Sequence, residues 1–374
     1  MTVPTAEDPA AAALQTAGQE SQAAGPKEAP APDAAIGTDG PPPAGPDDGP
    51  AGTGRAASPL AGLSLPLPPL LARSALWRVL TLLAAGVALA VLLYYPVGAW
   101  RAHKIDDAID FAPQGVTAGQ SEAVAAAAQL VRREIDGHAW AANKPFFMPA
   151  AILVSMPAYQ TGMTAMIGHF VSAMAYRIGR PEGGLDPDLA RAAELMSYPP
   201  DVWMIDPKAP WSKTFSTEKQ YRNAARSLEA YNLRLAAGTA GFDHGPQALS
   251  ATLEVIARDL EEASARLDGP VAAAGGWFAH GIGALYYSGK GRAYAALMLV
   301  RALGEDDRAT LAAKGLEPPW QAAIASLTAA AEPRPWVVLA GGPASAVVPN
   351  HLAIQGYHLQ RAAARLLQLS EALR

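Results

Sequence analysis

The stretch PQALSATLEVIARDLEEASARLD, residues 246–268, carries the clearest folding pattern in the sequence. Its large apolar residues recur at alternating intervals of four and three, the period of a helix that packs one face against its neighbours. This apolar stripe consists of Leu249, Leu253, Ile256, Leu260, Ala263 and Leu267. Charged residues fall off the stripe: Arg258, Asp259, Glu261 and Glu262. The pattern predicts a helix of a bundle, with a free coiled-coil dimer as the alternative.

Helical periodicity extends outward from this stretch through most of residues 101–374. Start and stop residues predict further helices over 120–136, 157–178, 187–197, 217–237, 283–303, 318–330 and 351–374. Asp186 before Pro187, Thr217 with Gln220 as a capping box, and Asn350 are the expected N-terminal caps. The sequence therefore predicts one mostly α, bundle-like domain over residues 101–374.

Three long segments between these helices are rich in Pro and aromatic residues. They cover residues 140–157, 198–215 and 333–349. Loops of this length are either functional or held in place by their own side chains. We favour loops held by their own aromatics.

Before this domain, residues 79–100 read VLTLLAAGVALAVLLYYPVGAW and contain no charge. A helix of this length spans roughly 33 Å, enough to cross a hydrocarbon layer of about 30 Å. We predict a transmembrane helix over residues 76–100, with the lipid bilayer as its partner and Pro96 at its exit or at a kink. Aromatic residues expected at the two membrane interfaces are Trp77, Tyr94, Tyr95 and Trp100.

The N-terminal segment, residues 1–72, has a different composition from the rest of the chain. Residues 1–70 contain 14 prolines, and no aromatic residue or histidine precedes Trp77. Such a segment has too few large apolar groups to offset its chain entropy. We predict a disordered tail there.

The basic residues beside the span do not decide its orientation, because two lie on each side. Arg73 and Arg78 precede the span, and Arg101 and Lys104 follow it. A signal-anchor arrangement places the tail in the cytoplasm and the large domain outside it. We adopt that orientation.

Several kinds of chemistry are excluded or disfavoured. The chain has no cysteine, so it has no disulfide, thiolate metal site or cysteine nucleophile. A net charge of −5 disfavours nucleic acid as a partner. His351 and His358 lie about 10 Å apart along a predicted helix, too far to share one metal ion. We predict no catalytic residue, cofactor or metal site.

We interpret two groups of polar residues as structural features without a chemical role. The run Ser288-Gly289-Lys290-Gly291 lacks the residues of a phosphate-binding loop, so we interpret it as a turn beside a helix with a basic patch. Acidic residues after the span suggest a solvated face near the membrane: Asp106, Asp107 and Asp110, then Glu122, Glu134 and Asp136.

The most site-like cluster lies between residues 198 and 222. Two Trp, a Tyr and an Arg near a Pro-rich loop could line a groove or contact a partner, or form the packing of the loop itself. The cluster comprises Asp201, Trp203, Asp206 and Trp211, followed by Glu218, Tyr221 and Arg222.

Several short phrases resemble a known family. They are Tyr94-Tyr95-Pro96, His103–Asp107, Pro145–Pro149, Met156-Pro157 with Gln160 and Gly162, Tyr198-Pro199 with Asp201–Trp203, Glu218–Arg222, Tyr231-Asn232 with Arg234-Leu235, Lys290-Gly291 with Tyr294, and Pro349–Leu352. From about Tyr94 to Arg374 the chain resembles the proteobacterial membrane-anchored domain-of-unknown-function family 2333. The resemblance implies a single-span protein of the inner membrane of a Gram-negative bacterium; it implies no activity and no site residues. Together with the adopted orientation, it leads us to expect the C-terminal domain in the periplasm.

Three functions follow as hypotheses. The first is a non-enzymatic envelope protein that binds another protein. The second is an envelope hydrolase that uses carboxylates of the region from Tyr198 to Arg222, which requires Asp201, Asp206 and Glu218 to converge in a pocket. The third is a small-molecule sensor, which requires a closed apolar cavity in the bundle.

Overall fold

The computed structural model describes residues 70–178, 184–205, 211, 214–273, 281–335, 337–341 and 349–374. Over these residues the regular structure is helical, apart from one isolated β-bridge between Ala340 and Asn350. The predicted mostly α fold is confirmed. The predicted disordered tail lies outside the described residues as far as residue 69, and residues 70–72 already belong to the first helix.

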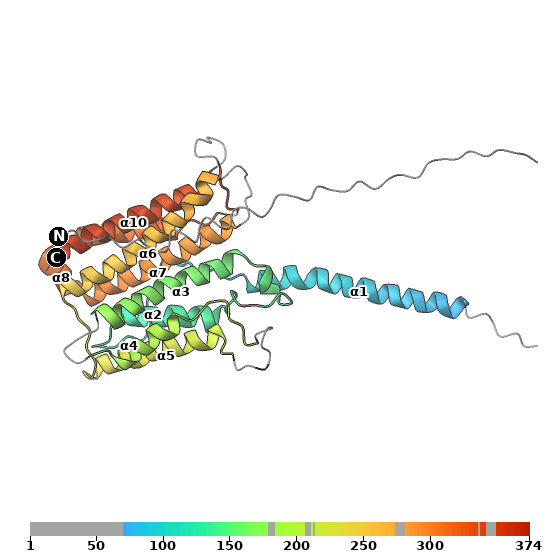
Figure 1. Cartoon of the computed structure of the whole chain (residues 1–374), viewed down its shortest axis with the longest axis horizontal. Helices are drawn as coiled ribbons and strands as arrows, with labels where there is room; N and C mark the ends of the chain where they lie inside the picture. Colours follow the sequence, from blue (N-terminus) through green and yellow to red (C-terminus); the bar gives the residue numbers. More distant parts are fainter. Residues whose placement is uncertain are drawn as a thin grey trace, which may run out of the picture. The chain divides into compact units, whose positions relative to one another are not determined.

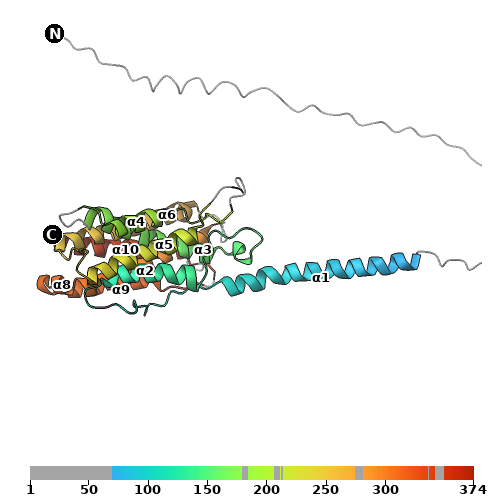
Figure 2. The ribbon, with the colours of Figure 1, turned by 90° about the horizontal axis from the view of Figure 1, so that it is seen from below.

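The helices follow one another along the chain with connections of very different lengths. They are α1 (Leu70–Ala102), α2 (Glu122–Arg132), the π-turn η2 (Arg133–Gly137), the 3-10 turn η3 (Pro149–Ile152), α3 (Ser155–Ala173), the π-turn η4 (Met174–Ile178), α4 (Pro187–Met196), α5 (Thr217–Ala236), α6 (Pro246–Ala273), α7 (Ile282–Asp306), α8 (Arg308–Lys314), α9 (Glu317–Ala331) and α10 (His351–Leu373). In Figure 1 the colours follow the chain from its N-terminus to its C-terminus, and Figure 2 shows the same ribbon from below.

Helix α7 is the central helix of the bundle. It packs against α2, α3, α6, α9 and α10, while α6 pairs with α10 and α4 pairs with α5 (Figure 1). Its side chains are buried almost without interruption from Gly289 to Leu303. The hydrophobic core therefore forms around α7.

The stripe that predicted a bundle helix is buried as expected. Leu253, Ile256 and Leu260 have no exposed surface, and the helix that carries them, α6, packs against α10, α7 and α3. The bundle interpretation is therefore correct for this helix. Asp259, which we placed off the stripe, is also buried, because α7 supplies Arg292 as its partner.

The interpretation of residues 288–291 as a turn with a basic patch is wrong. These residues lie inside α7, and Lys290 is buried. A Cβ atom on Gly291 would collide with the backbone oxygen of Tyr159 in α3, and one on Gly162 would collide with that of Ser288. The glycines of this run therefore allow two helices to approach closely; they do not form a turn.

Helix starts agree with the sequence in two cases and differ in one. The side chains of Asp186 and Asn350 accept hydrogen bonds from the first turns of α4 and α10, as predicted. The predicted capping box at Thr217 is wrong, because Ser216 caps α5. The Thr217 hydroxyl instead donates to the carbonyl of Pro199 at 2.8 Å, so it holds the preceding loop.

Helix α1 differs from all other helices in its surroundings. The segment Ser74–Ala102 is long and apolar enough to cross a membrane, and none of its most apolar window is buried in the protein. The helix continues through Pro96 to Ala102, so Pro96 does not mark its end. Its contacts with the rest of the chain include those with η3, close to its C-terminal end.

Candidate functional site

The acidic segment after α1 does not form a fully solvated face. Asp107 is only 2% exposed, and Glu134 has no exposed surface at all, whereas Asp110 is exposed. A buried carboxylate is costly unless basic or donor groups surround it. The solvated-face interpretation is therefore wrong for Asp107 and Glu134, because each has buried partners that are distant in sequence.

Asp107 is held by Lys290 of α7 and by Arg334. The Nζ atom of Lys290 lies 2.6 Å from Oδ2 of Asp107, and Nε of Arg334 donates to the same oxygen at 2.8 Å. Lys290 also donates to the carbonyls of Ala331 and Pro333, each at 2.7 Å. We call Asp107, Lys290 and Arg334, with these two carbonyls, the lysine clamp.

The lysine clamp fixes the segment that leaves α1 to the core of the bundle and to the C-terminal end of α9. The donors of the Lys290 ammonium are directed at one carboxylate and at helix-end carbonyls, a favourable place for a cation. Burial lowers the pKa of Lys290, whereas the contact with Asp107 acts in the opposite direction. Because these contacts occupy the ammonium, the clamp joins parts of the chain and is not poised for reaction.

A second buried polar cluster lies beside the clamp, at η2. Three side chains lie within hydrogen-bond distance of the carboxylate of Glu134: Arg133 at 3.1 Å, His138 at 3.2 Å and Gln160 at 3.1 Å. Arg133 also donates to the hydroxyl of Tyr294 at 2.9 Å and to the carbonyl of Asp106 at 3.0 Å. This cluster ties η2 and α7 to the start of the segment that follows α1.

A third polar group joins α3, α6 and α7. Asp259 pairs with Arg292, and its Oδ1 lies 2.6 Å from Nδ1 of His169. Burial raises the pKa of Asp259, but the bonds from His169 and Arg292 outweigh it and leave the pKa below its ordinary value. His169 is half exposed and lines a hollow of about 400 Å³, so a proton can reach this pair from solvent.

The cluster predicted between residues 198 and 222 is divided by the fold. Tyr221 is buried, packs edge-on against Trp140 and donates to the carbonyl of Tyr198 at 3.0 Å. Arg222 pairs with Asp136 at 2.7 Å. Both residues therefore stabilise the loop and the helix that follows.

The remaining described members of that cluster differ in their exposure. Asp201 is exposed, Trp203 is half-buried and Trp211 is 97% exposed. Asp206 lies outside the described residues. Glu218 is bound by Lys144 at 2.7 Å and by Asn143 at 2.7 Å, and these bonds hold its pKa below the ordinary value despite burial, which raises it. The carboxylate of Glu218 is thus occupied by its own neighbours.

The four predicted interface residues all lie on α1. Trp77, Tyr94 and Trp100 are exposed, and Tyr95 is half-buried. The hydroxyls of Tyr94 and Tyr95 donate to the carbonyls of Phe147 and Phe146 at 3.2 and 3.0 Å. The two tyrosines therefore bind a loop of the bundle in addition to facing outward.

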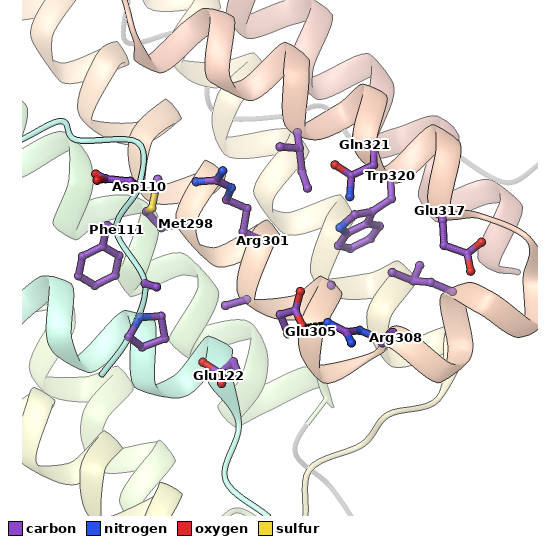
Figure 3. A pocket seen from close by; sticks show the side chains of 16 residues that line it. Asp110, Phe111, Glu122, Met298, Arg301, Glu305, Arg308, Glu317, Trp320 and Gln321 are labelled. Carbon is purple, nitrogen blue, oxygen red and sulfur yellow. Dashed lines mark hydrogen bonds and ion pairs between the residues drawn. The ribbon is translucent and has the colours of Figure 1, made fainter. Parts of the chain in front are cut away.

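A surface groove that the sequence did not indicate runs between α7 and α9. Its volume is about 780 Å³, and Trp320 is a buried part of its wall (Figure 3). Figure 3 shows Arg301, Glu305 and Arg308 approaching from α7 and α8, and Trp320 and Gln321 approaching from α9. The other lining residues are Asp110, Phe111, Ala112, Pro113, Glu122, Met298, Ala302, Gly304, Leu311, Glu317 and Ile324.

The groove has a negative charge balance, with four acidic and two basic side chains in its lining. Arg301 donates to the carbonyl of Ile109, and Arg308 pairs with Glu305. Over the described residues no basic group pairs with Asp110, Glu122 or Glu317. Burial raises the pKa of Glu122, and the nearby carboxylates of Asp306 and Glu305 raise it further.

Sequence reasoning missed the lysine clamp and the pair of Asp259 with Arg292, although a signal was present. Lys290 lies four residues after Tyr286 and seven before Leu297, and both of these neighbours are buried. Asp259 lies three residues after Ile256 and four before Ala263 in the same way. A charge that falls within an apolar stripe indicates a buried partner. The identity of the partner, however, depends on how distant helices pack.

Within the described parts of the chain, no group of three or more His, Asp or Glu side chains could hold a metal ion. Comparison with protein-family models, with curated proteins and with solved structures gave no match to this chain.

Proposed function

We propose that this chain is a single-pass membrane protein whose helical bundle binds a segment of another protein in the groove between α7 and α9. The membrane is the inner membrane of a Gram-negative bacterium, with the N-terminal tail in the cytoplasm and the bundle in the periplasm. Kinship with family 2333 over residues 94–374 belongs to the same proposal. A reporter fused after Arg374 that is active only in the cytoplasm would contradict the orientation.

The shape and lining of the groove carry this proposal. Protein interfaces combine an aromatic or apolar centre with a polar rim, and Trp, Met and Arg are enriched in them. The groove has this composition, with Trp320 and Met298 in its wall and Glu317 and Gln321 at exposed positions. Its volume is large enough for several side chains of a bound segment.

The charge of the groove indicates the chemistry of the partner. Asp110, Glu122 and Glu317 have no basic partner within the described residues, and burial together with the carboxylates of Asp306 and Glu305 raises the pKa of Glu122. A Lys or Arg side chain placed among these carboxylates would compensate them. We therefore infer a partner segment that carries basic and apolar residues.

Site-specific photo-crosslinking in living cells tests this function. A photoreactive residue replaces Gln321, an exposed residue of the groove, or Gln368, an exposed residue of α10 that does not line it. We expect a discrete adduct with another protein from position 321 and none from position 368. Equal adducts at both positions, or none at position 321, would contradict the proposal.

A charge reversal in the groove tests the inferred chemistry of the partner. Glu317→Arg should reduce the adduct at position 321 several-fold. The substitution replaces an unpaired carboxylate by a positive charge, which repels a basic segment. Glu371→Arg on α10 is the matched control, since Glu371 is also exposed and does not line the groove. An adduct of equal yield in both variants would show that the groove does not bind through this charge.

A further inference from the structure

The loop between η2 and α3 carries an apolar surface beside the C-terminal end of α1. Residues 145–154 read PFFMPAAILV and contain no charge. Phe146 is 84% exposed, and Phe147, Ile152 and Val154 are each about half exposed. Exposed aromatic and branched apolar side chains gathered in one loop indicate a contact surface.

A neighbouring loop extends this surface. The ring of Trp203 lies 5.8 Å from that of Phe147, and Met204 and Ile205 follow with about half of their surfaces exposed. We call the exposed residues of the two loops the seat: Phe146, Phe147, Ile152, Val154, Met204 and Ile205.

The contacts with α1 fix the position of the seat along the axis of the span. Tyr94 and Tyr95 bind the carbonyls of Phe147 and Phe146, and the ring of Pro149 lies directly against Gly98. Tyr94 precedes Arg101, the first charge after the apolar run, by seven residues. At about 1.5 Å per residue, the loop is attached about 10 Å before the end of the apolar run. If α1 crosses a bilayer, this level lies at or inside the edge of the hydrocarbon layer.

The first four backbone carbonyls of this loop have hydrogen-bond donors within the protein, as a lipid environment requires. In a bilayer a carbonyl without a partner is costly, because no water is present to bind it. Each of the four carbonyls of residues 145–148 accepts a hydrogen bond, from Met148 N, Tyr95 OH, Tyr94 OH and Ala151 N in that order. Two of these donors are side chains of α1 itself.

We infer that the seat inserts into the outer hydrocarbon and headgroup region of the bilayer from which α1 emerges, and that it holds the bundle against the membrane surface. The occupant of this surface is lipid, since the seat is uncharged, aromatic and joined to the apolar part of α1. Gly98 makes the arrangement possible, because a side chain there would displace Pro149. This inference rests on α1 as a membrane span, which is part of the proposed function.

Single-cysteine spin labelling tests the inference, since the natural chain contains no cysteine. Phe146→Cys, Leu92→Cys in the span, and Leu233→Cys near the end of α5 are labelled in the full chain in lipid nanodiscs. All three replaced side chains are exposed. Relaxation of each label by oxygen, which partitions into lipid, is compared with relaxation by a water-soluble nickel chelate.

We expect the labels at positions 146 and 92 to respond several-fold more to oxygen than to the chelate, and the label at 233 to respond more to the chelate. A label at 146 that behaves like that at 233, while that at 92 remains in lipid, overturns the inference and leaves the span intact. If the label at 92 also lies in water, the span of the proposed function fails as well. A label at 146 that neither reagent reaches indicates a protein occupant and also overturns the inference.

A second pair of variants tests the attachment of the seat to α1. Gly98→Leu should move the label at 146 towards water by forcing Pro149 away, whereas Gly86→Leu should leave it in lipid, because Gly86 has no neighbour within 4 Å. An unchanged label at 146 in Gly98→Leu would contradict the role of this contact.

Discussion

Helices α1 and α7 are both long and mostly apolar, yet they lie in different surroundings. Over its most apolar window α1 has no residue buried in the protein, and it has no charge between Val79 and Trp100. Helix α7 is buried from Gly289 to Leu303 except at Arg301, and it nevertheless carries Lys290 and Arg292 inside the core. Buried charge is tolerated where the protein supplies carboxylates and carbonyls, and lipid supplies neither. If α1 spans a bilayer, as proposed, the distribution of charge distinguishes a helix surrounded by protein from one surrounded by lipid.

Removal of the buried ammonium of α7 should have the largest effect. Lys290→Met leaves the carboxylate of Asp107 buried beside one remaining cation, Arg334, and should lower the free energy of unfolding by about 3–5 kcal/mol. Urea unfolding of the full chain in detergent micelles measures this. Lys219→Met, at an exposed lysine of α5, should cost less than about 1 kcal/mol. Equal costs would show that the lysine clamp is not a buried ion pair.

Introduction of a charge into α1 tests whether this helix is surrounded by lipid. Val87→Arg places a guanidinium near the middle of the apolar run, where insertion costs about 2.5–3.5 kcal/mol, and it should lower the membrane-integrated fraction of the chain. Ser74→Arg, before the run, should have little effect, because its head group can reach the interface. Quantitative membrane extraction at alkaline pH compares the two. A Val87→Arg chain that integrates fully would weaken the assignment of α1 to lipid.

Asp307, at the C-terminal end of α7, should make the stability of the protein depend on pH. Burial raises the pKa of Asp307 to about 6 from 3.8, against the opposing effect of His244 and with support from Asp306 and Asp243. A raised pKa means that the folded state holds the proton more tightly, so stability falls as the pH rises from about 4 to 6. A difference of roughly two between the two pKa values corresponds to about 3 kcal/mol.

Asp307→Asn should therefore lose this component. Its free energy of unfolding relative to that of the natural chain should rise by up to about 3 kcal/mol between pH 4 and pH 6.5. Urea unfolding at several pH values measures the difference. A difference that stays constant over this range would show that Asp307 titrates normally in the folded protein.

The smallest expected effect concerns glycines of the two helices. Gly291→Ala forces α3 and α7 apart at the carbonyl of Tyr159 and should cost about 1–3 kcal/mol. Gly86→Ala adds a methyl group in open space on α1 and should leave the stability of the bundle unchanged. Thermal unfolding monitored by circular dichroism compares them, and a tolerated Gly291→Ala would contradict the close crossing of these helices.

The sequence predicted the helices well, because periodicity and caps are local properties. The stripe from Leu249 to Leu267 and the cap at Asn350 are present as expected. It failed where a residue depends on a distant partner: Asp107 was assigned to solvent, and Lys290 was assigned to a turn, because the helix packing that joins them is not visible in either segment. In the cluster from Asp201 to Arg222, Tyr221 and Arg222 likewise find partners outside the cluster, in Trp140 and Asp136.

The groove between α7 and α9 was not predictable from any single motif. Its lining residues come from the segment after α1 and from α2, α7, α8 and α9, and each looks like an ordinary surface or core residue by itself. Only the packing of these elements brings Trp320 and unpaired carboxylates such as Glu122 into the lining of one groove.

The accessibility of residue 87 tests the central claim, that lipid surrounds α1, most directly. Val87→Cys and Arg365→Cys supply the only thiol in otherwise cysteine-free chains, and they are treated with a water-soluble maleimide in opened native membranes. We predict that the cysteine at 365 reacts at once, whereas the cysteine at 87 reacts only after the membrane is dissolved and the chain denatured. Equally rapid reaction at position 87 in intact bilayers would contradict the account.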